Sequence, residues 1–421
     1  THTISCLFPP GSSSGAITVR GYNNECLFGD PALFDLVVNP LPGNAGTIFS
    51  SSGAEVCQYQ EDVPYSIAPV PDATGYHWTY SGTGATLESS GPGLLIDFSS
   101  AASSGVLMVT PTNACGDGVP SAPFPVTVKP RPTVTLNVCN ALTTTRNGRP
   151  IVLKGGYPGG NGETWLGPGV SMEAPGIWTF NPGDAGVSSG TSTTAASNAV
   201  TFRYTNEEGC YDEKNLSIRV FASNATDPCP GTIRDVRDGK VYRTFQAGTG
   251  VNSRCWMGEN LNFGDFTDDN LPQSDNCLDE KYCTGNQSAG CNSTGGYYQW
   301  EEVTAYAETP AYQDLCPPGW HLPSGTEWEY LVNANQGAGV AGGYLKDPML
   351  PDHFNGLLAG IYYQNARWSF QSGAGAGDMY WTSDLLPGGK ALARGLNFSN
   401  LSVSSYPASR AHAFSVRCVR N

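Results

Sequence analysis

The feature that most constrains this chain is a turn that occurs three times at a regular spacing. In each copy an extended segment runs into a turn that contains asparagine and then cysteine, and alternating apolar residues follow. The copies are GYNNEC at Gly21–Cys26, TPTNAC at Thr110–Cys115 and YTNEEGC at Tyr204–Cys210. A spacing of roughly 90 residues is typical of β-sandwich modules. Each copy therefore predicts the last two strands of one module.

Composition agrees with a series of loop-rich β domains. The chain has 421 residues, which is too long for a single ordinary core. It contains 52 Gly and 31 Pro but only 14% charged residues, about half the usual share. The net charge of -15 argues against nucleic acid as a partner, because neutralising phosphates requires clustered Lys and Arg.

Thirteen cysteines indicate an oxidising compartment. They form no C-x2-C pair of the kind that zinc sites use, and no apolar run approaches the roughly 18 residues that a membrane-spanning helix needs. We therefore expect an extracellular protein at the cell surface, without a membrane span. Only the final strands of the first module are recognisable, so we expect Thr1 to lie inside a domain.

Upstream cysteines offer partners for the cysteines of the repeated turns. In the second and third modules a cysteine lies in the first strand, and a disulfide to the turn cysteine of the same module would close a long loop. The short first module contains one further cysteine. The predicted pairs are Cys57–Cys115, Cys139–Cys210 and Cys6–Cys26.

These modules resemble the PKD-like and immunoglobulin-like repeats of large secreted surface proteins of the Bacteroidetes. The resemblance covers residues 1–224 and rests on the cysteine positions, the repeated turn and the aromatic segment YHWTY. It implies a partial immunoglobulin-like module at 1–41, a PKD-like or immunoglobulin-like sandwich at 42–130 and an immunoglobulin-like sandwich at 131–224. Trp78 stands where such sandwiches bury an aromatic residue, so we expect it in the core.

After residue 224 the sequence changes character and a second resemblance begins. CPGTIRDVRDGKVYRTFQAG predicts a hairpin that turns at Asp-Gly, and RCWMGENLNFG, CPPGWHLPSGTEWEYL, MYWTSD and FSVRCVRN follow in order. Together these motifs are similar to the Fibrobacter succinogenes major paralogous domain of secreted bacterial proteins. The resemblance covers roughly residues 229–421 and implies a domain at 225–421 with an α+β, C-type-lectin-like fold. The whole chain is thus expected to be mainly β.

The second resemblance also implies how the cysteines of the carboxy-terminal domain pair. One disulfide joins the start of a helix to the last strand, one closes a short loop, and one spans the first hairpin. The implied pairs are Cys316–Cys418, Cys283–Cys291 and Cys229–Cys255. Cys277 is left over, either free or bonded elsewhere.

The segment HLPSGTEWEYL contains the signals of a short helix. Ser324 and Glu327 have the S-x-x-E spacing of a capping box. Trp328 and Leu331 lie three residues apart on one helical face, which predicts that this face packs on the core. We expect His321, just before the helix, to be structural rather than a ligand or a catalytic residue.

Signatures of catalysis are weak, so we expect that the chain is not an enzyme. GSSSG at Gly11–Gly15 and GVSSG at Gly186–Gly190 match G-x-S-x-G, but they lie in Ser/Gly-rich loops without the strand-to-helix turn that exposes a nucleophile. An enzymatic alternative would need His321 and a carboxylate such as Glu327 to meet in an open cleft. The helix-cap role of Glu327 argues against it.

One acidic segment has the oxygen-rich composition of a calcium loop. It is DFTDDNLPQSDNCLDE, at Asp265–Glu280, and its spacing is not that of an EF-hand. The alternative is a solvated acidic loop, and calcium is the one candidate cofactor. The candidate ligands are Asp265, Asp268, Asp269, Asp275 and Asp279.

A second candidate site is the Gly/Ala-rich loop within Leu357–Trp381, which is flanked by aromatic residues. Aromatic rings on such a loop can stack on sugar faces or fill pockets of a protein partner. The alternative is that these rings fill the core. The candidate ligand-binding residues are Tyr362, Tyr363, Trp368 and Phe370.

Two functions fit these predictions. The first is a secreted bacterial cell-surface adhesin or appendage protein, in which a β-sandwich stalk presents a lectin-like domain to a glycan, a polymer or a protein on another surface. The alternative is a structural subunit of an extracellular filament or surface layer, in which sheet edges self-associate by strand addition.

Overall fold

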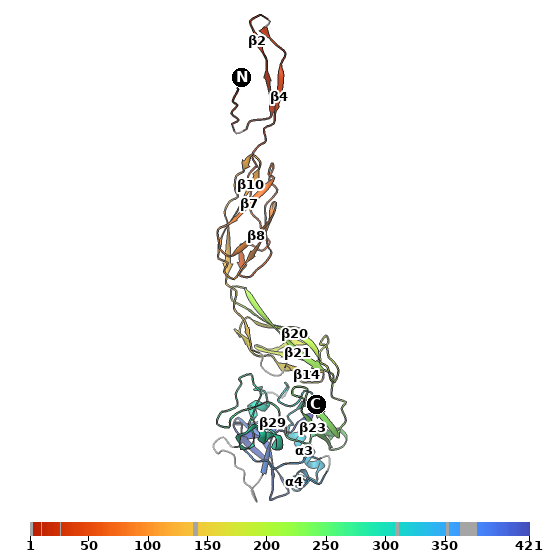
Figure 1. Cartoon of the computed structure of the whole chain (residues 1–421). Coiled ribbons are helices and arrows are strands. Elements are labelled where there is room, and N and C mark those ends of the chain that lie inside the picture. The colour runs from red at the N-terminus through yellow and green to blue at the C-terminus, as the bar shows by residue number, and fades with distance from the viewer. Residues whose placement is uncertain are drawn as a thin grey trace. The chain divides into compact units, whose positions relative to one another are not determined.

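The computed structural model describes residues 3–9, 11–25, 27–137, 142–307, 311–350, 353–362 and 377–421. The described chain is mainly β, as predicted, with many small sheets and few short helices (Figure 1). It divides into two compact units. One comprises Thr1–Pro132 and Thr205–Tyr211, and the other comprises Thr133–Tyr204 and Asp212–Asn421.

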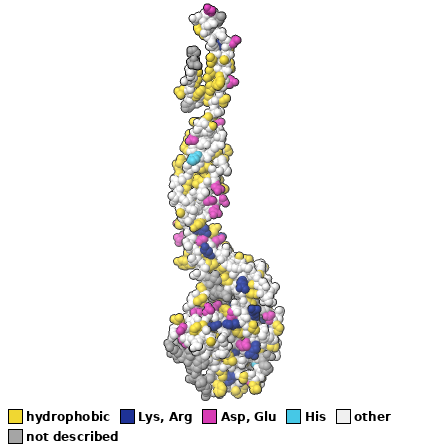
Figure 2. All heavy atoms as spheres, viewed as in Figure 1, with side chains coloured by type: hydrophobic (Ala, Val, Ile, Leu, Met, Phe, Trp, Pro, Cys, Tyr) yellow, Lys and Arg dark blue, Asp and Glu magenta, His cyan; other side chains and the backbone are white. Residues whose placement is uncertain are grey.

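The first unit begins with a narrow hairpin. Strands β1 (Gly15–Val19) and β4 (Ala32–Leu36) form an antiparallel two-stranded sheet, extended by β2 (Tyr22–Asn23) and β3 (Leu27–Phe28). Large apolar side chains on and beside this hairpin are exposed, and Figure 2 shows hydrophobic side chains gathered over this part. They include Ile4, Leu7, Val19, Phe28, Leu33, Phe34 and Val37.

The rest of the first unit contains a two-sheet sandwich. In the larger sheet the first strand joins the last one in parallel, while the other neighbours are antiparallel. The larger sheet contains β5 (Glu55–Cys57), β7 (Gly75–Tyr80), β10 (Gly105–Asn113), β11 (Gly116–Asp117) and β12 (Phe124–Lys129). The smaller contains β6 (Val63–Ser66), β8 (Ala85–Ser90) and β9 (Gly93–Phe98). Trp78 is buried in the core between them, as expected.

The second unit begins with a sandwich of the same design. Its larger sheet again pairs its first and last strands in parallel. That sheet contains β14 (Thr143–Thr145), β17 (Glu163–Leu166), β20 (Ala196–Thr205) and β21 (Tyr211–Phe221), and the smaller one contains β15 (Ile151–Val152), β18 (Val170–Ala174) and β19 (Ile177–Phe180). A short pair, β13 (Thr135–Leu136) and β16 (Gly156–Tyr157), lies beside them. Trp165 and Phe202 pack together in the core.

The carboxy-terminal domain, from Gly231 onward, is built on a five-stranded sheet. The order is β22 (Gly231–Arg234), β23 (Val241–Ala247), β24 (Arg254–Met257), β33 (Val419–Arg420) and β28 (Trp320–His321). The end of the chain therefore lies inside this sheet. A second, three-stranded sheet contains β29 (Gly377–Leu386), β30 (Lys390–Asn397) and β31 (Val403–Ser409). Side chains of both sheets share one core.

Shorter elements complete this domain. Two strand pairs are β25 (Asp265–Phe266) with β26 (Glu280–Lys281) and β27 (Tyr298–Gln299) with β32 (Ala413–Phe414). The helices are α1 (Cys291–Thr294), α2 (Trp300–Val303), α3 (Gly325–Ala334), α4 (Ala341–Lys346) and the 3-10 turns η1 (Gly250–Asn252), η2 (Thr284–Asn286) and η3 (Ser288–Gly290). Within the described ranges, no helix has the length and apolar character needed to cross a membrane. The predicted lectin-like fold and the predicted domain boundaries stay predictions.

The predicted capping box begins α3. The Glu327 amide donates to Ser324 Oγ at 3.2 Å, and the Ser324 amide donates to the Glu327 carboxylate at 2.9 Å. Trp328 and Leu331 are fully buried, and the Trp328 ring packs edge-on against Trp256. The helix is therefore held by its cap at one end and by an aromatic core along one face.

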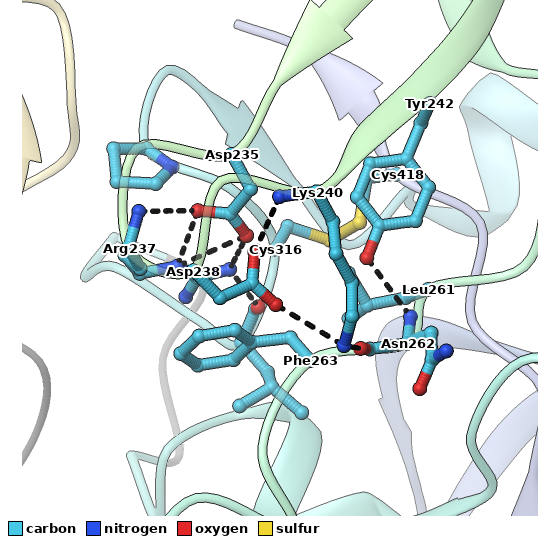
Figure 3. A network of polar contacts seen from close by, with 12 residues as sticks. Asp235, Arg237, Asp238, Lys240, Tyr242, Leu261, Asn262, Phe263, Cys316 and Cys418 are labelled. Atoms are coloured by element: carbon cyan, nitrogen blue, oxygen red, sulfur yellow. Dashed lines mark hydrogen bonds and ion pairs between the residues drawn. A yellow bond between two sulfur atoms is a disulfide. The ribbon is translucent and has the colours of Figure 1, made fainter. Parts of the chain in front are cut away.

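A buried ion pair stabilises the predicted β22–β23 hairpin (Figure 3). Asp235 is fully buried, and Arg237 donates to both of its carboxylate oxygens at 2.7–3.2 Å. The same guanidinium donates to the Leu315 carbonyl at 2.9 Å and lies 3.6 Å from the centroid of the Phe263 ring. Leu315 directly precedes Cys316, so the ion pair connects the hairpin turn to the segment that leads into α3.

The three disulfides implied for the carboxy-terminal domain are present, namely Cys229–Cys255, Cys283–Cys291 and Cys316–Cys418. The last one joins the segment before α3 to Cys418, the residue that directly precedes β33, across 102 residues of sequence. Cys277, which was left over, is also disulfide-bonded.

The predictions for the sandwich cysteines are wrong where the structure describes them. Cys57 bonds to Cys210 of the following sandwich, and Cys115 is free and exposed. Cys6 is also free and exposed, so it does not pair with Cys26. The reason lies in the parallel pairing of β5 with β12, which places Cys57 opposite Lys129, where the chain leaves this sandwich. Cys26 and Cys139 lie outside the described residues.

Candidate functional site: a groove around His321

An open groove of about 890 Å³ lies in the second unit, beside the first turn of α3. Its lining combines basic, aromatic and hydrogen-bonding side chains of the carboxy-terminal domain and of the neighbouring sandwich. Its polar and aromatic members include Arg149, Arg254, His321, Glu327, Tyr330 and Asn421.

The sheet order explains why these residues meet. His321 ends β28 and pairs with Val419 of β33, so Asn421, two residues further on, lies next to the imidazole. Arg254 begins β24, on the other side of β33. Tyr330 is three residues beyond Glu327, so both lie on the same face of α3.

His321 is held at both ring nitrogens. Nε2 lies 3.0 Å from a Glu327 carboxylate oxygen, and Nδ1 lies 2.8 Å from Asn421 Oδ1. The Asn421 amide donates to the Asn147 carbonyl at 3.3 Å, which turns Oδ1 toward the imidazole. Two polar partners therefore hold the imidazole ring in one orientation.

Glu327 is therefore a helix cap and the partner of His321 at the same time. Burial raises the pKa of the Glu327 carboxyl, but hydrogen bonds from His321, its charge and the hydrogen bonds from Ser324 lower it to about 2. The cap role was expected to oppose this pairing, and that expectation is wrong because the one carboxylate contacts both His321 and Ser324. Ser324 Oγ contacts Glu327 and not His321, so this arrangement does not form a nucleophile–base pair.

The basic residues line the rim of the groove. Arg254 lies 3.7 Å from Glu327, and its guanidinium is 5.8 Å from the centroid of the Tyr330 ring. Arg149, from the sandwich, lies 3.9 Å from the buried Asp314. The groove thus offers one half-exposed aromatic face, two guanidinium groups and fixed polar partners, which suits recognition better than proton transfer.

The predicted aromatic site is not assembled in the described residues. Tyr362 is buried, its ring packs against Tyr282, and its hydroxyl donates to the Asp269 carbonyl at 2.8 Å. For this residue the core alternative is correct. Tyr363, Trp368 and Phe370 lie outside the described residues.

The predicted calcium ligands have separate partners. Among the described residues, no three His, Cys, Asp or Glu side chains are grouped as a metal ion would require. The Asp268 carboxylate accepts from the Asn270 amide, and Asp275 pairs with Lys154 at 3.1 Å. Asp269 contributes backbone atoms to its contacts with Asn286 and Tyr362, Asp265 is exposed on β25, and Asp279 lies near Arg237. The set therefore does not fit a calcium site.

Carboxylates of the acidic segment and α2 instead hold the loop to the core. Glu302 is buried and accepts from the Glu280 amide at 2.7 Å and from the Tyr306 hydroxyl at 2.8 Å. Glu280 in turn accepts from Thr267 Oγ1 at 2.7 Å. Burial raises the pKa of Glu302 from 4.5 to about 8, although both hydrogen bonds oppose the rise.

Replacing Glu302 with glutamine is expected to flatten the pH dependence of stability. Between pH 4.5 and about 8 folded Glu302 keeps a proton that the unfolded chain loses, so the wild-type free energy of unfolding falls as pH rises. Glu302→Gln stays neutral, so it should gain on the order of 4 kcal/mol over wild type at pH 8 and nothing at pH 4. Urea unfolding of both proteins across this range measures the difference, and parallel pH profiles would contradict the assignment.

Several residues of the groove were not found from the sequence. His321 and Glu327 lie in the segment HLPSGTEWEYL, where a structural role was predicted for both. Arg254 and Asn421 stand at the ends of the motifs RCWMGENLNFG and FSVRCVRN, but no role at a site was predicted for them, and Arg149 lies in no motif. Their proximity depends on packing between segments far apart in the chain.

Comparison with known proteins identifies the part of the chain that carries most of the groove. Residues 250–420 match the family model of the Fibrobacter succinogenes major domain. Residues 41–126 match the model of the PKD-like domain. Both resemblances expected from the sequence are thereby confirmed. Arg254, His321, Glu327 and Tyr330 all belong to the major domain, while Arg149 lies outside it.

Solved structures resemble the chain at low identity. The fibronectin(III)-like modules of Clostridium thermocellum CbhA are 15% identical with a TM-score of 0.24, covering 42% of this chain and 94% of that one. Drosophila N-cadherin EC1-4 is 12% identical with a TM-score of 0.17, covering 51% of this chain and 59% of that one. Domains 5-6 of the S-layer protein SbsC are 14% identical with a TM-score of 0.16, covering 42% and 98%.

No curated protein matches the chain. The disulfides, the PKD-like module and the neighbouring sandwich nevertheless indicate an extracellular or secreted protein, because disulfides persist in oxidising compartments.

Proposed function

We propose that this chain is a secreted bacterial cell-surface adhesin, in which β-sandwich modules carry a major domain that binds a glycan through the groove around His321. The observation that carries the proposal is the half-exposed Tyr330 ring beside Arg254, in an open groove of about 890 Å³. Tyrosine combines a large apolar face with a polar end, which suits a ligand that is apolar on one face and polar at its edges.

The chemistry around Tyr330 fits a sugar ring. A pyranose presents C–H groups to an aromatic face and hydroxyl groups to donors at its edge, and binding sites combine such apolar surface with a few fixed polar groups. Arg254 and Arg149 supply these donors. Both arginines already lie near carboxylates, so a strongly anionic ligand is not required to satisfy them.

A glycan array with wild-type and variant proteins tests this proposal. Tyr330→Ala should weaken binding of the strongest glycan at least about tenfold, since loss of an aromatic anchor commonly costs more than 1 kcal/mol. Tyr344→Ala is the matched control, because Tyr344 is an exposed tyrosine on α4 outside the groove. Equal binding by the two variants, or no glycan bound by the wild type, would contradict the proposal.

A further inference from the structure

The amino-terminal hairpin is the end of a sandwich like the two complete ones. In the second module, LLIDFSSAASSG at Leu94–Gly105 leads from β9 of the smaller sheet into β10 of the larger sheet. ISCLFPPGSSSG at Ile4–Gly15 has the same length, with phenylalanine at the same position and a serine-rich loop that ends at the first residue of β1. Residues 4–8 are therefore equivalent to β9, and β1 and β4 are equivalent to β10 and β12.

The burial of equivalent residues shows what this first module lacks. Phe98 is 1% exposed whereas Phe8 is 49% exposed, and Val109 is 0% exposed whereas Val19 is 58% exposed. In the complete module these side chains are covered by β5–β8. Among the described residues, β4 pairs with β1 alone, so its other edge is open, whereas β12 has β5 on that edge.

The junctions between successive modules are also equivalent. Asn206 donates from its amide to the Pro130 carbonyl at 3.0 Å, and its Oδ1 accepts from the Cys210 amide at 2.9 Å. In the same way Asn113 donates to the Pro40 carbonyl at 2.8 Å, and its Oδ1 accepts from the Cys115 amide at 2.8 Å. Cys115 therefore lies at the junction with the first module in the same way as Cys210 lies at the junction with the second module.

The equivalence between the two junctions indicates where a disulfide partner of Cys115 would lie. Cys210 bonds to Cys57, the last residue of β5, with a Cα–Cα distance of 5.7 Å. Cys57 lies opposite Lys129, which directly precedes Pro130. In the first module the corresponding position is Asn39, which directly precedes Pro40.

We propose that the open edge of β4 binds a parallel strand that ends in a cysteine opposite Asn39, and that this cysteine forms a disulfide with Cys115. The occupant is the amino-terminal half of a sandwich, equivalent to β5–β8. In both complete modules that half runs directly into the strand equivalent to residues 4–8, so we assign it to chain continuous with residue 3. A second copy is a poor donor, because its own β5 and Cys57 already pair with β12 and Cys210.

Closure of this disulfide needs an oxidant. The two thiols release two protons and two electrons as the S–S bond forms, and the electron pair reduces a disulfide oxidant such as glutathione disulfide to two thiols by exchange.

A synthetic peptide with the sequence of β5 tests whether the open edge of β4 binds such a strand in the intact chain. The peptide GAEVCQYQ, residues 53–60, carries β5 with its cysteine. In a glutathione redox buffer it should form a mixed disulfide with Cys115 at least about tenfold faster than a peptide with the same residues in scrambled order, as strand pairing raises the local concentration. Cys6, which is also free and exposed, serves as the internal control and should react equally with both peptides. Equal rates of the two peptides at Cys115, or a Cys6–Cys115 bridge without peptide, would overturn the proposal.

A fusion protein tests whether the occupant can be supplied by chain that is continuous with residue 3. Residues 42–92, which supply β5–β8, are joined ahead of residue 3 in an otherwise unchanged chain. Peptide mapping should show Cys115 bonded to the added copy of Cys57, and Phe8 should become protected from oxidative labelling. A Cys→Ser change in the added copy should leave Cys115 free while Phe8 stays protected. If Cys115 captures the strand peptide but not the joined segment, the assignment to continuous chain is wrong.

Discussion

Replacing Cys316 and Cys418 with serine is expected to lower the free energy of unfolding of the carboxy-terminal domain by about 5 kcal/mol. The disulfide closes a loop of 102 residues, so its loss frees a large part of the unfolded chain. Both sulfur atoms are also buried, and the serine hydroxyl groups would lie in an apolar core. Urea unfolding followed by tryptophan fluorescence measures the change, because Trp320 and Trp328 lie close in sequence to Cys316.

The matched control is the removal of Cys283 and Cys291, which close a loop of eight residues and are also buried. The same relation gives about 2.5 kcal/mol for this shorter loop. Losses of equal size for the two pairs would show that loop length does not govern the effect, and the Cys316–Cys418 bond would then lose its special role in the fold.

Arg237→Met is expected to destabilise the same domain by about 3–5 kcal/mol. The substitution leaves Asp235 fully buried without its cation, and removes the hydrogen bond to the Leu315 carbonyl and the contact with the Phe263 ring. Thermal and urea unfolding of the variant and of the wild type measure this loss.

Arg243→Met is the control for this substitution. Arg243 pairs with Glu259 at 2.8 Å, but both side chains are largely solvated, so the expected loss is below about 1 kcal/mol. A comparable loss at both arginines would contradict the account, because burial of the ion pair would then make no difference.

Local features of the fold could be predicted from the sequence. The capping box of Ser324 and Glu327 depends on residues three apart, and the turn of the β22–β23 hairpin depends on Asp-Gly, where Gly239 has a φ of 80°. Both are decided by contacts between near neighbours. The disulfides of the carboxy-terminal domain followed from a family resemblance rather than from local chemistry.

The disulfides of the sandwiches could not be predicted in the same way. Sequence spacing gives Cys57 a plausible partner in its own module, but it does not reveal that the strand containing Cys57 pairs in parallel with β12 and ends at the junction. Cys57 therefore meets the turn of the following sandwich. A repeat pattern predicts the modules well, and predicts contacts between successive modules only when the direction of each strand is known.

The candidate site shows the same limit. His321 and Glu327 were singled out in their motif, but as structural residues, and Arg149 and Asn421 come from the neighbouring sandwich and from the last residue of the sequence. Their proximity is a result of tertiary packing. Of the aromatic site predicted around Tyr362, the structure describes Tyr362 alone, and that ring packs in the core against Tyr282.

Hydroxyl-radical footprinting of the intact chain, with and without its strongest-binding glycan, tests the central claim most directly. The account predicts that the glycan protects the Tyr330 ring several-fold and leaves the reactivity of Tyr344 unchanged. Protection of Tyr344 with Tyr330 unaffected, or protection confined to the sandwich modules, would place the contact elsewhere and contradict the proposed role of the groove.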